Sequence, residues 1–296
     1  MKDIIIICSR IESSRLPNKA FLKTYGISFI DNLYNRLNKN FKVIMAIPEG
    51  QRQYYKFPNI YEGPHDDPLL RTYQAAIVER DVENIIRVTH DKVLIEPSLI
   101  EQALDMHKRE NIDYTYLSGC GDGLGFEIVT MDCLRKAVEL MNGKPTEFLS
   151  YAFRNVAEKI APFYAGYQSD ARFLLDYPED YSFFMTLFGI LGPNVRPSVA
   201  IAYLKKNPEL IQINKLPEVT IYSCVYNGSK YINNCLNSIK EQCSSQFPGF
   251  FEVIILDDSS SDNSYEIIVK KALYEGGIKW MKNTSNNGLA ASSNLV

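Results

Sequence analysis

Short apolar runs alternate with amphipathic segments along this chain, and that alternation restricts the possible folds more than any other feature. In the first two thirds, the strand-like runs are Asp3–Cys8, Lys42–Ile47, Asn84–Thr89, Tyr114–Leu117, Phe126–Thr130 and Arg172–Asp176. Segments with apolar residues at helical spacing lie between them, over Phe29–Asn38, Leu70–Val78 and Ser98–His107 and from Pro178 onward. Strands that alternate with helices form parallel sheets, so the pattern predicts an α/β fold with a largely parallel sheet.

A second alternation begins near Pro217. Its predicted strands are Val219–Val225, Phe251–Leu256 and Ile278–Met281, and its predicted helices are Ser229–Gln242 and Asp262–Leu273. The segment Lys205–Leu216 separates the two series, so we expect two domains, 1–215 and 216–296. Three strands in about 80 residues bury only a modest core, and we therefore expect the second domain to be incomplete.

Composition and charge argue against several classes of function. The formal net charge is -3, from 32 Lys and Arg against 35 Asp and Glu, which gives no electrostatic reason to expect a nucleic acid partner. The apolar run Ile4–Cys8 is too short for a signal peptide or a membrane span. The 6 cysteines include no C-x-x-C pair, which indicates reduced thiols instead of disulfides or a metal site. We therefore expect a cytoplasmic protein.

The loop after the first predicted strand concentrates groups that can hold phosphates. It contains three cations, Arg10, Arg15 and Lys19, together with the hydroxyl group of Ser13. α/β folds place ligands at the carboxyl ends of their strands, which is where this loop begins. Guanidinium and ammonium groups bind a triphosphate by charge-assisted hydrogen bonds and neutralise a pyrophosphate leaving group. A solvated basic loop with surface ion pairs fits the same composition equally well.

Five motifs follow one another in the first domain. The opening motif is Arg-x-x-Ser-x-Arg-Leu-Pro-x-Lys, at Arg10–Lys19. The other four lie at His65–Arg71, Arg87–Pro97, Asp122–Glu127 and Leu175–Asp180. In this order they resemble the motifs of the cytidylyltransferases, the group of CMP-KDO synthetases and proteins like the spore coat polysaccharide biosynthesis protein F. The likeness covers residues 1–215 and implies a Rossmann-like nucleotide-diphospho-sugar transferase fold.

The resemblance implies roles for the charged residues of these motifs. Asp91 and Asp176 would hold Mg2+ together with the triphosphate of CTP. The other implied roles are catalysis and phosphate binding for Arg10, Arg15 and Lys19, nucleotide binding for Ser13, Asp66, Asp67 and Arg71, and substrate binding for Asp122 and Glu127. A carboxylate or phosphate oxygen of a small acidic or phosphorylated sugar-like acceptor would attack the α-phosphorus, so catalysis would be mostly positioning and charge neutralisation. Taken singly, Asp176 could instead cap a helix, and Asp91 could be a turn residue.

Four positions depart from the family's motifs. Glu12 stands where the family has a small residue, Asn18 and His90 where it has glycine, and Gly125 where it has aspartate. A carboxylate beside the triphosphate disfavours binding unless a cation such as Arg10 or Arg15 pairs with it. These changes indicate an altered substrate or a weakened activity. The stretch Gly119–Gly125 precedes a strand instead of a helix, so we interpret it as a turn or substrate loop and not as a phosphate loop.

Three motifs of the second domain form another set. They lie at Val225–Gly228, Leu256–Ser264 and Asn286–Ala290. They resemble the N-terminal part of family 2 glycosyltransferases, which have the GT-A fold. The resemblance implies that Asp257 or Asp258 contacts the nucleoside of a nucleotide sugar, and the alternative is a capped helix entry. The family's later D-x-D motif and catalytic base would lie beyond residue 296, so we do not expect this part to transfer sugar by itself.

Three hypotheses follow from these patterns. The leading one is a CTP-dependent cytidylyltransferase that supplies a CMP- or CDP-linked donor for surface glycan biosynthesis. The second is a family 2 glycosyltransferase whose first domain is a degenerate nucleotide-binding accessory. The third gives the first domain a scaffolding role without enzyme activity. The cations and aspartates of the motifs favour the first hypothesis, whereas Glu12 and His90 favour the other two.

Overall fold

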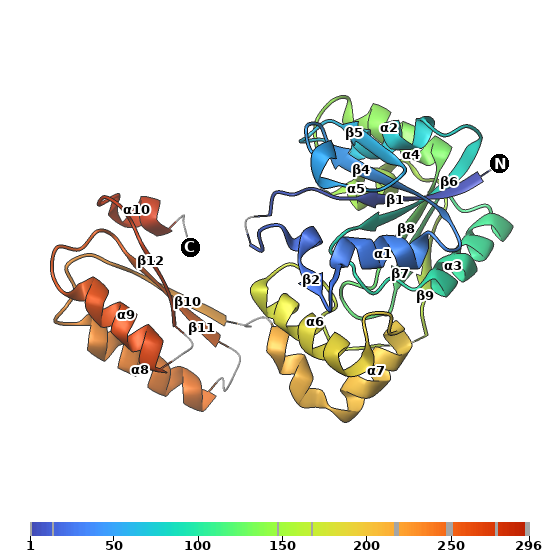
Figure 1. Ribbon diagram of the computed structural model, residues 1–296. Helices are drawn as coiled ribbons and strands as arrows, with labels where there is room; N and C mark the ends of the chain where they lie inside the picture. Colours follow the sequence, from blue (N-terminus) through green and yellow to red (C-terminus); the bar gives the residue numbers. More distant parts are fainter. Residues whose placement is uncertain are drawn as a thin grey trace. The chain divides into compact units, whose positions relative to one another are not determined.

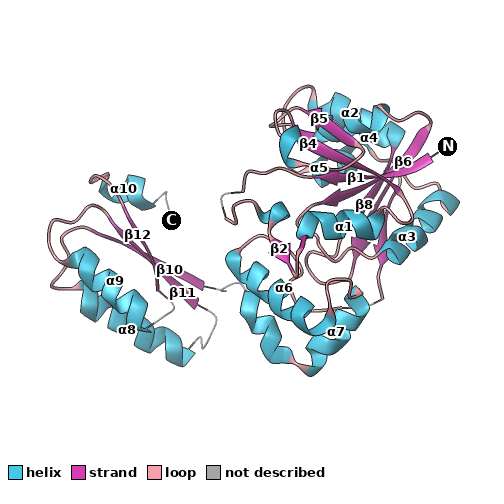
Figure 2. Cartoon of the chain, viewed as in Figure 1, coloured by secondary structure: helices cyan, strands magenta, loops and turns pink. Residues whose placement is uncertain are grey.

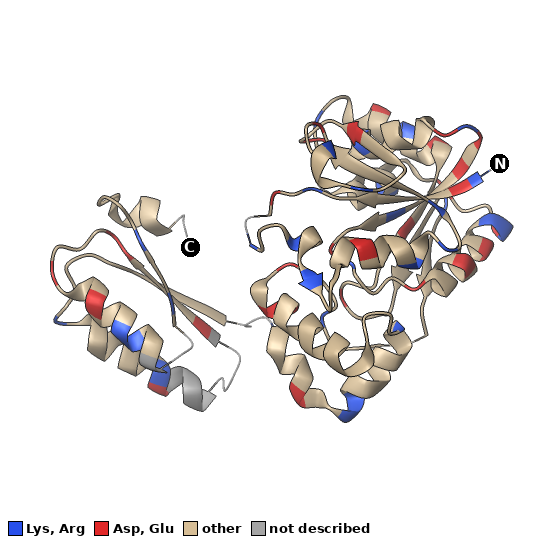
Figure 3. Cartoon of the chain, in the orientation of Figure 1, with Lys and Arg blue, Asp and Glu red and all other residues tan. Residues whose placement is uncertain are grey.

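The computed structural model describes residues 2–13, 15–146, 148–166, 168–215, 219–246, 251–275 and 278–293. The chain divides into two compact units, Met1–Lys215 and Leu216–Val296 (Figure 1). Leu216 and Pro217, in the predicted boundary region, lie outside the described residues. Across the described ranges, no helix combines the length and apolarity needed to span a bilayer. Basic and acidic residues are interspersed in both units (Figure 3).

A 7-stranded sheet forms the centre of the first unit, in the order β5-β4-β1-β6-β8-β7-β9. Its strands are β1 (Lys2–Cys8), β4 (Lys42–Pro48), β5 (Ile60–Gly63), β6 (Val82–Thr89), β7 (Tyr114–Ser118), β8 (Glu127–Thr130) and β9 (Ile160–Tyr164). Only β8 runs antiparallel to its neighbours in this sheet. A separate hairpin joins β2 (Lys23–Thr24) to β3 (Ile27–Ser28). The predicted α/β class is confirmed.

Helices cover both faces of this sheet (Figure 2). They are α1 (Phe29–Leu37), α2 (Pro68–Ile77), α3 (Pro97–Arg109), α4 (Met131–Met141), α5 (Leu149–Val156), α6 (Pro178–Leu191) and α7 (Pro197–Lys206). α2, α3, α6 and α7 each begin at a proline, whose fixed φ suits the first helical position. α1 and α3 bury one core against the sheet, and α2, α4 and α5 bury the other. α6 and α7 form a third apolar cluster with the extended segment before α6.

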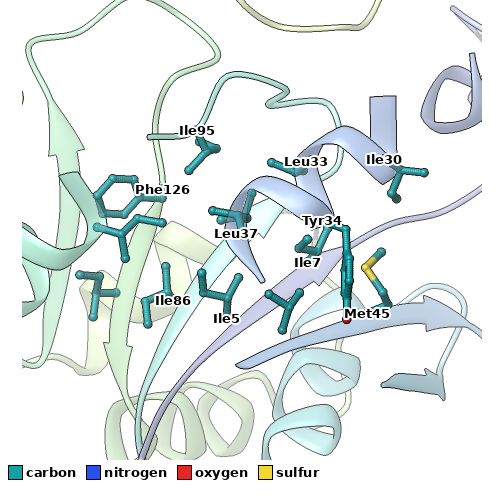
Figure 4. Packing of buried hydrophobic residues seen from close by; sticks show 14 of the residues in the cluster. Ile5, Ile7, Ile30, Leu33, Tyr34, Leu37, Met45, Ile86, Ile95 and Phe126 are labelled. Carbon is teal, nitrogen blue, oxygen red and sulfur yellow. The ribbon is translucent and has the colours of Figure 1, made fainter. Parts of the chain in front are cut away.

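Four consecutive isoleucines make β1 apolar on both faces. Ile5 and Ile7 pack in the same core as Leu33 of α1 (Figure 4). Ile4 and Ile6 point into the core on the opposite face. All four side chains are fully buried, as is typical of a parallel strand covered by helices on both sides. The loop that follows β1 therefore starts from the most deeply packed part of the sheet.

The prediction of a strand over Arg172–Asp176 is wrong. Among the described residues, this segment makes one isolated bridge and joins no sheet. Its backbone amides bind loop carbonyls instead: Phe173 N donates to Asp122 O at 2.6 Å, and Leu175 N donates to Asp91 O at 2.9 Å. The segment thus ties the loops after β6 and β7 to the start of α6. β5 and β9, which were not predicted, are the edge strands, where partial exposure weakens the apolar pattern.

The second unit contains a 3-stranded parallel sheet in the order β10-β11-β12. Its elements are β10 (Val219–Val225), α8 (Ile232–Gln246), β11 (Phe251–Asp257), α9 (Ser264–Glu275), β12 (Ile278–Lys282) and α10 (Gly288–Ser293). The core residues are Val225, Ile232, Leu236, Val253, Ile255 and Ile268. The predicted strands agree with the structure to within one residue. Both predicted helices start a few residues later than expected, because capped turns precede them.

Candidate active site

A cavity of about 570 Å³ opens where the carboxyl ends of β1 and β6 lie side by side. Parallel neighbours end at the same edge of a sheet, so the loops after these strands face a common space. The predicted site residues that line the cavity are Arg10, Ser13, Arg15, Lys19, Asp66, Arg71, Asp91 and Asp176. Asp67, Asp122 and Glu127 do not line it. The fold thus brings together cations and carboxylates from distant parts of the sequence.

Lys19 lies between the two predicted metal ligands. Its Nζ is 2.7 Å from Asp176 Oδ1 and 3.6 Å from Asp91 Oδ2. The side chains of Lys19 and Asp176 are each less than a tenth exposed, so this contact is shielded from water. Lys19 opens the short helix η1 (Lys19–Phe21) directly after Asn18, whose φ of 54° lies in the left-handed region. Asparagine tolerates that region better than most residues, which explains why it can replace the family's glycine.

Arg15 approaches Asp176 from the other side. Its Nη2 is 2.8 Å from Asp176 Oδ2, and its Nη1 donates to the Tyr177 hydroxyl at 3.1 Å. The guanidinium group also lies over the Tyr177 ring, 5.1 Å from the centroid. The hydrogen bond to Tyr177 and the charge of Asp176 raise the pKa of Arg15 despite partial burial. Both carboxylate oxygens of Asp176 are therefore bound by a cation.

Asp176 is not the helix cap that its sequence position allows. The N-cap of α6 is Tyr177, and the Asp180 carboxylate accepts from the backbone amides of Asp176 and Tyr177, each at 2.8 Å. The Asp176 side chain lies one residue before the N-cap and lines the cavity. Asp180 is itself held by Asn214 Nδ2 at 2.9 Å. The capping alternative for Asp176 is thus wrong.

Asp91 is held in its charged form. Its Oδ1 accepts from the Thr89 hydroxyl at 2.5 Å. Burial by itself would raise the pKa of Asp91, but the charge of His90 whenever its ring is protonated, the charge of Lys19 and the Thr89 hydrogen bond lower it. The neighbouring His90 is buried, and its Nδ1 lies 3.3 Å from Cys8 O, so burial lowers the pKa of this imidazole and favours the neutral ring. His90 therefore fills the family's glycine position without placing a full charge beside Asp91.

Glu12 is bound by groups that sequence reasoning did not single out. Gln51 Nε2 donates to both of its carboxylate oxygens, at 2.8 and 2.6 Å, and His65 Nε2 lies 3.7 Å from Oε2. Burial opposes ionisation of Glu12, but its own backbone N–H, Gln51 and His65 outweigh it and lower the pKa of the carboxyl. Arg15, one of the two expected partners, pairs with Asp176 instead. Gln51 follows β4, the strand that pairs with β1. Its position just after the end of β4 is the sequence signal that could have placed it beside the loop after β1.

The segment before α2 contributes one wall of the cavity. Arg71 is almost fully buried, and its Nη1 donates to Pro64 O at 2.5 Å and to His65 O at 3.1 Å. Asp66 Oδ1 accepts from the His65 ring, 2.7 Å from Nδ1. Asp67 caps α2, because its Oδ1 accepts from Leu70 N at 2.9 Å. Asp66 and Arg71 therefore reach the cavity, whereas Asp67 has a structural position.

Glu127 lies behind the cavity in a buried polar network. It accepts from Arg87 Nη1 at 2.5 Å and from the Tyr114 hydroxyl at 2.6 Å. Burial alone would lower the pKa of Arg87, but the charge of Glu127 outweighs this effect and raises it. Arg87 itself lines the cavity, so Glu127 acts on that space through Arg87. The predicted direct role of Glu127 in substrate binding has no support in this position.

The glycine-rich loop before β8 packs against the protein backbone. At Gly123, φ is 86°, and an added Cβ would lie 2.2 Å from the Phe173 carbonyl carbon. At Gly121, it would lie 2.9 Å from Ala171 O. Glycine is needed here for close backbone approach, which agrees with the interpretation of a turn and not with a phosphate loop. Asp122, between them, is mostly exposed and lies 3.6 Å from Arg172 Nε.

In the second unit, the first of the two predicted nucleoside-binding aspartates, Asp257, ends β11, and Asp258 follows it directly. Asp258 accepts from Asn283 Nδ2 at 2.6 Å, from Asn287 N at 3.0 Å and from Gly288 N at 2.9 Å. Asp257 is fully buried and accepts from Ser260 N at 3.1 Å. Its second oxygen, Oδ1, has no partner among the described residues. The two carboxylates thus accept hydrogen bonds from the loops that follow β11 and β12.

The helix-entry alternative also has a physical basis in this unit. Asp262 accepts from Ser264 N and from Ser229 N, each at 3.0 Å. The first bond lies at the start of α9, the second joins it to the turn after β10, and the Ser264 hydroxyl is the main cause that lowers the pKa of the Asp262 carboxyl. The capping residue is Asp262, so Asp257 and Asp258 are not used for that purpose.

Solved structures similar to this chain include cytidylyltransferases. One, from Leptospira borgpetersenii, superposes with a TM-score of 0.66 and 21% identity, over 74% of this chain and 100% of that chain. Another is CMP:2-keto-3-deoxy-manno-octonic acid synthetase in complex with CTP, with a TM-score of 0.50 and 15% identity, over 64% of this chain and 99% of that chain. At these identities, the similarity establishes the fold.

Similar sequences cover a comparable share of the chain. An uncharacterized protein of Methanocaldococcus jannaschii is 28% identical over an alignment of 236 residues, which covers 72% of this chain and 95% of that protein. The spore coat polysaccharide biosynthesis protein SpsF of Bacillus subtilis is 23% identical over 243 residues, 71% of this chain and 97% of that protein.

The end of the chain is similar to a different set of proteins. Residues 220–296 match the model of glycosyl transferase family 2. Hyaluronan synthase of Pasteurella multocida is 34% identical over 103 residues, 34% of this chain but only 10% of that enzyme. The predicted resemblances and fold class are thus confirmed: cytidylyltransferase-like structure comes first, and a sequence that matches family 2 glycosyl transferases follows.

Proposed function

We propose that the first unit transfers CMP from CTP to a small acidic or phosphorylated sugar-like acceptor. An acceptor oxygen forms a bond to the α-phosphorus of CTP, and the bond from this phosphorus to the α,β-bridging oxygen breaks. Pyrophosphate leaves with the bonding electron pair. Two similarities support CTP and a glycan-related acceptor: a synthetase of this fold was solved with CTP, and the similar Bacillus subtilis protein is named for polysaccharide biosynthesis.

The observation that carries this proposal is the meeting of Arg15, Lys19, Asp91 and Asp176 in one cavity. Without nucleotide, the two cations neutralise the two aspartates. A triphosphate offers stronger anionic partners to Arg15 and Lys19, so these side chains can exchange a carboxylate for phosphate oxygens. The same cations then offset the negative charge that builds up on the departing pyrophosphate.

The residues present fit Mg2+ bound together with the triphosphate. The described residues contain no cluster of three or more His, Cys, Asp or Glu that would hold a metal alone. Mg2+ is commonly held by one or two carboxylates plus phosphate oxygens and water, and Asp91 and Asp176 both face the ammonium group of Lys19. We propose these two aspartates as its ligands. The ion would supply additional charge neutralisation on the phosphates.

Little acid–base catalysis is required for such an acceptor. A carboxylate or phosphate oxygen is already ionised at neutral pH, so no proton must be removed before attack. The buried His90 favours its neutral form, which agrees with a site that works by positioning. The chain's own contribution is then to orient the triphosphate through Arg15 and Lys19 and to hold the charged form of Asp91.

Pyrophosphate release tests the proposal directly. The full chain is incubated with CTP, Mg2+ and a panel of ulosonic acids, phosphonates and sugar phosphates, and CTP binding is measured separately by calorimetry. Lys19→Met should lower kcat/KM by about 100-fold or more, because a cation that stabilises the leaving group is lost. The matched control is Lys23→Met, which alters an exposed lysine of β2. Absence of both pyrophosphate release and CTP binding in the wild type would favour the accessory or scaffold hypothesis.

We also propose that the second unit binds the nucleoside of a nucleotide sugar at the carboxyl edge of β11. The supporting observation is Asp257, whose Oδ1 is buried without a donor, whereas Asp258 already accepts three hydrogen bonds. A buried acceptor without a partner is costly, and a nucleoside N–H would satisfy it. Calorimetric titration with UDP and CDP tests this, with Asp257→Asn expected to abolish binding. Unchanged binding by that variant would shift the role to Asp258.

A further inference from the structure

Glu12 is a carboxylate on the loop that carries the proposed phosphate-binding cations. It is the one acidic residue in the segment 9–19 of the sequence. It lines the same cavity as the three cations of this loop, Arg10, Arg15 and Lys19, and its side chain is 57% exposed. A carboxylate in this cavity competes with a triphosphate for the cations and repels its charge. A nucleotide is therefore bound well only if the Glu12 carboxylate is held away from them.

Gln51 holds this carboxylate from behind the loop. It follows β4 and is only 5% exposed, so its side chain has a fixed place in the fold. Its Nε2 donates to both carboxylate oxygens of Glu12, at 2.8 and 2.6 Å, and its Oε1 accepts from Ile11 N at 3.1 Å. These contacts define the orientation of the amide, because a flipped amide would place its oxygen against the carboxylate and its N–H groups against Ile11 N–H. Glu12 is thus bound by a buried amide donor.

Tyr55, a second residue after β4, supports the start of the same loop. Its hydroxyl oxygen lies 2.8 Å from Ser9 Oγ, and both side chains are buried. This contact holds the loop where it leaves β1, and the bond between Gln51 Oε1 and Ile11 N extends the support by two residues. The backbone is therefore held without the two bonds from Gln51 Nε2. Those two bonds act on the charge of Glu12.

His65 approaches Glu12 from the side exposed to solvent. Its Nε2 lies 3.7 Å from Glu12 Oε2, and its Nδ1 lies 2.7 Å from Asp66 Oδ1. The side chains of all three residues are more than half exposed, so water screens these contacts. A hydrogen bond from a buried amide to a charged acceptor contributes more than such an exposed contact. Gln51 is therefore the main group that directs the Glu12 carboxylate.

We propose that Gln51 is a positioning residue that holds the Glu12 carboxylate toward the segment after β4, away from the phosphate-binding cations. The proposal rests on the proposed binding of a nucleoside triphosphate in this cavity. Gln51 acts through Glu12 and does not itself line the cavity. Where the cytidylyltransferase motif has a small residue, this chain has a carboxylate together with the amide that restrains it. The pair makes an acidic residue in the loop compatible with phosphate binding.

Reversal of the pair in the full chain tests this assignment. Gln51→Glu keeps an acceptor for Ile11 N but places a second carboxylate against Glu12, which then turns into the cavity. This variant should weaken the binding of CTP and of inorganic tripolyphosphate, each titrated by calorimetry with Mg2+, by about tenfold. Adding Glu12→Gln restores one amide and one carboxylate to the pair. The double variant should bind both probes within about threefold of the wild type.

The matched control is Gln53→Glu. It adds the same charge two residues away, at an exposed position, and should change both affinities by less than about threefold. Far-UV circular dichroism shows whether each variant is folded. Should Gln51→Glu not fold, Gln51→Met takes its place, because methionine removes both polar contacts without adding a charge. Gln51→Met should weaken tripolyphosphate binding, and Glu12→Ala added to it should restore that binding.

The outcomes separate this inference from the proposed function. A folded Gln51→Glu variant that binds tripolyphosphate as tightly as the wild type would refute the role of Gln51. A second substitution at Glu12 that restores no binding would also refute it, because the loss would then come from distortion of the loop. The expected order of tripolyphosphate affinities, in a chain that does not bind CTP, would support the role of Gln51 and refute the CTP-dependent function. A wild type that binds neither probe would refute both.

Discussion

Replacement of Lys19 by methionine should destabilise the first unit, because the ammonium group of Lys19 is the cation that Asp91 and Asp176 share. In the wild type, Lys19 Nζ lies 2.7 Å from Asp176 and 3.6 Å from Asp91. The side chains of Lys19 and Asp176 are 9% and 7% exposed, so solvent screens their attraction only weakly. Methionine keeps most of the length of the stem but leaves the carboxylates without this cation.

The size of the effect follows from burial and from the remaining partner. Loss of one member of a buried ion pair costs about 3–5 kcal/mol. Arg15 stays 2.8 Å from Asp176 and compensates in part, so we expect a loss of about 2–3 kcal/mol. For a unit of this size, each 1 kcal/mol lowers Tm by roughly 2–4 °C, which gives a decrease of about 5–10 °C.

Two spectroscopic signals separate the units in this assay. Far-UV circular dichroism during heating is dominated by the larger first unit, whereas the single tryptophan, Trp280, reports on β12 of the second. Lys19→Met should lower the midpoint temperature of the circular dichroism transition and leave the midpoint temperature of the tryptophan transition unchanged. Adding Asp176→Asn should recover about 1 kcal/mol or more, because the carboxylate oxygen that loses Lys19 then no longer carries a buried charge. A Tm within about 1 °C of the wild type, or strictly additive losses, would refute the coupling.

Three further predictions concern other contacts. Tyr177→Phe removes the hydroxyl that accepts from Arg15 and should raise KM for CTP by about two- to fivefold at unchanged kcat in steady-state assays, because that hydrogen bond is exposed. Burial lowers the pKa of His107 from 6.5 to about 4, so stability is complete above pH 6.5 and falls as the pH drops toward 4. The full loss is up to about 3 kcal/mol. Urea unfolding at pH 7 and pH 5 should show a smaller difference in the free energy of unfolding for His107→Gln than for the wild type. Gly123→Ala should cost at least about 1–3 kcal/mol more than Gly143→Ala, since both have positive φ but only Gly123 abuts backbone; equal costs in urea would contradict this.

The sequence patterns predicted the strands that are most deeply buried and the edge of the sheet where the site lies. β1 and β4 match their predicted spans closely, because apolar runs without polar interruptions leave little choice of structure. The Arg172–Asp176 segment has the same local pattern, yet its apolar residues pack in the cluster of α6 and α7. A local apolar pattern shows that a segment is buried, but it does not show whether the segment pairs with another strand. The pattern of Arg172–Asp176 therefore could not distinguish it from a strand of the sheet.

The site was predictable as a set of residues but not as a set of contacts. A family motif points to Lys19, Asp91 and Asp176, whereas the placement of Lys19 between the two aspartates depends on packing across more than half of the chain. The partner of Glu12 was not predictable, because Gln51 belongs to no motif and reaches Glu12 only through the neighbouring positions of β1 and β4. Single substitutions in a motif are therefore interpretable only once their spatial neighbours are known.

The four isoleucines of β1 have a consequence for how accurately the loop after it is placed. Since both faces of the strand are equally apolar, a slip by one residue would bury the same side chains, so the apolar pattern does not define the register. The polar ends define it: the Asp3 carboxylate accepts from Asn84 at 2.8 Å and Lys108 at 2.6 Å, and Cys8 O accepts from His90 N at 3.1 Å. A one-residue slip would carry the following loop about 3.3 Å along the strand axis and separate Lys19 from its carboxylates. The anchors at the two ends of β1 thus set the alignment of the loop that carries Lys19.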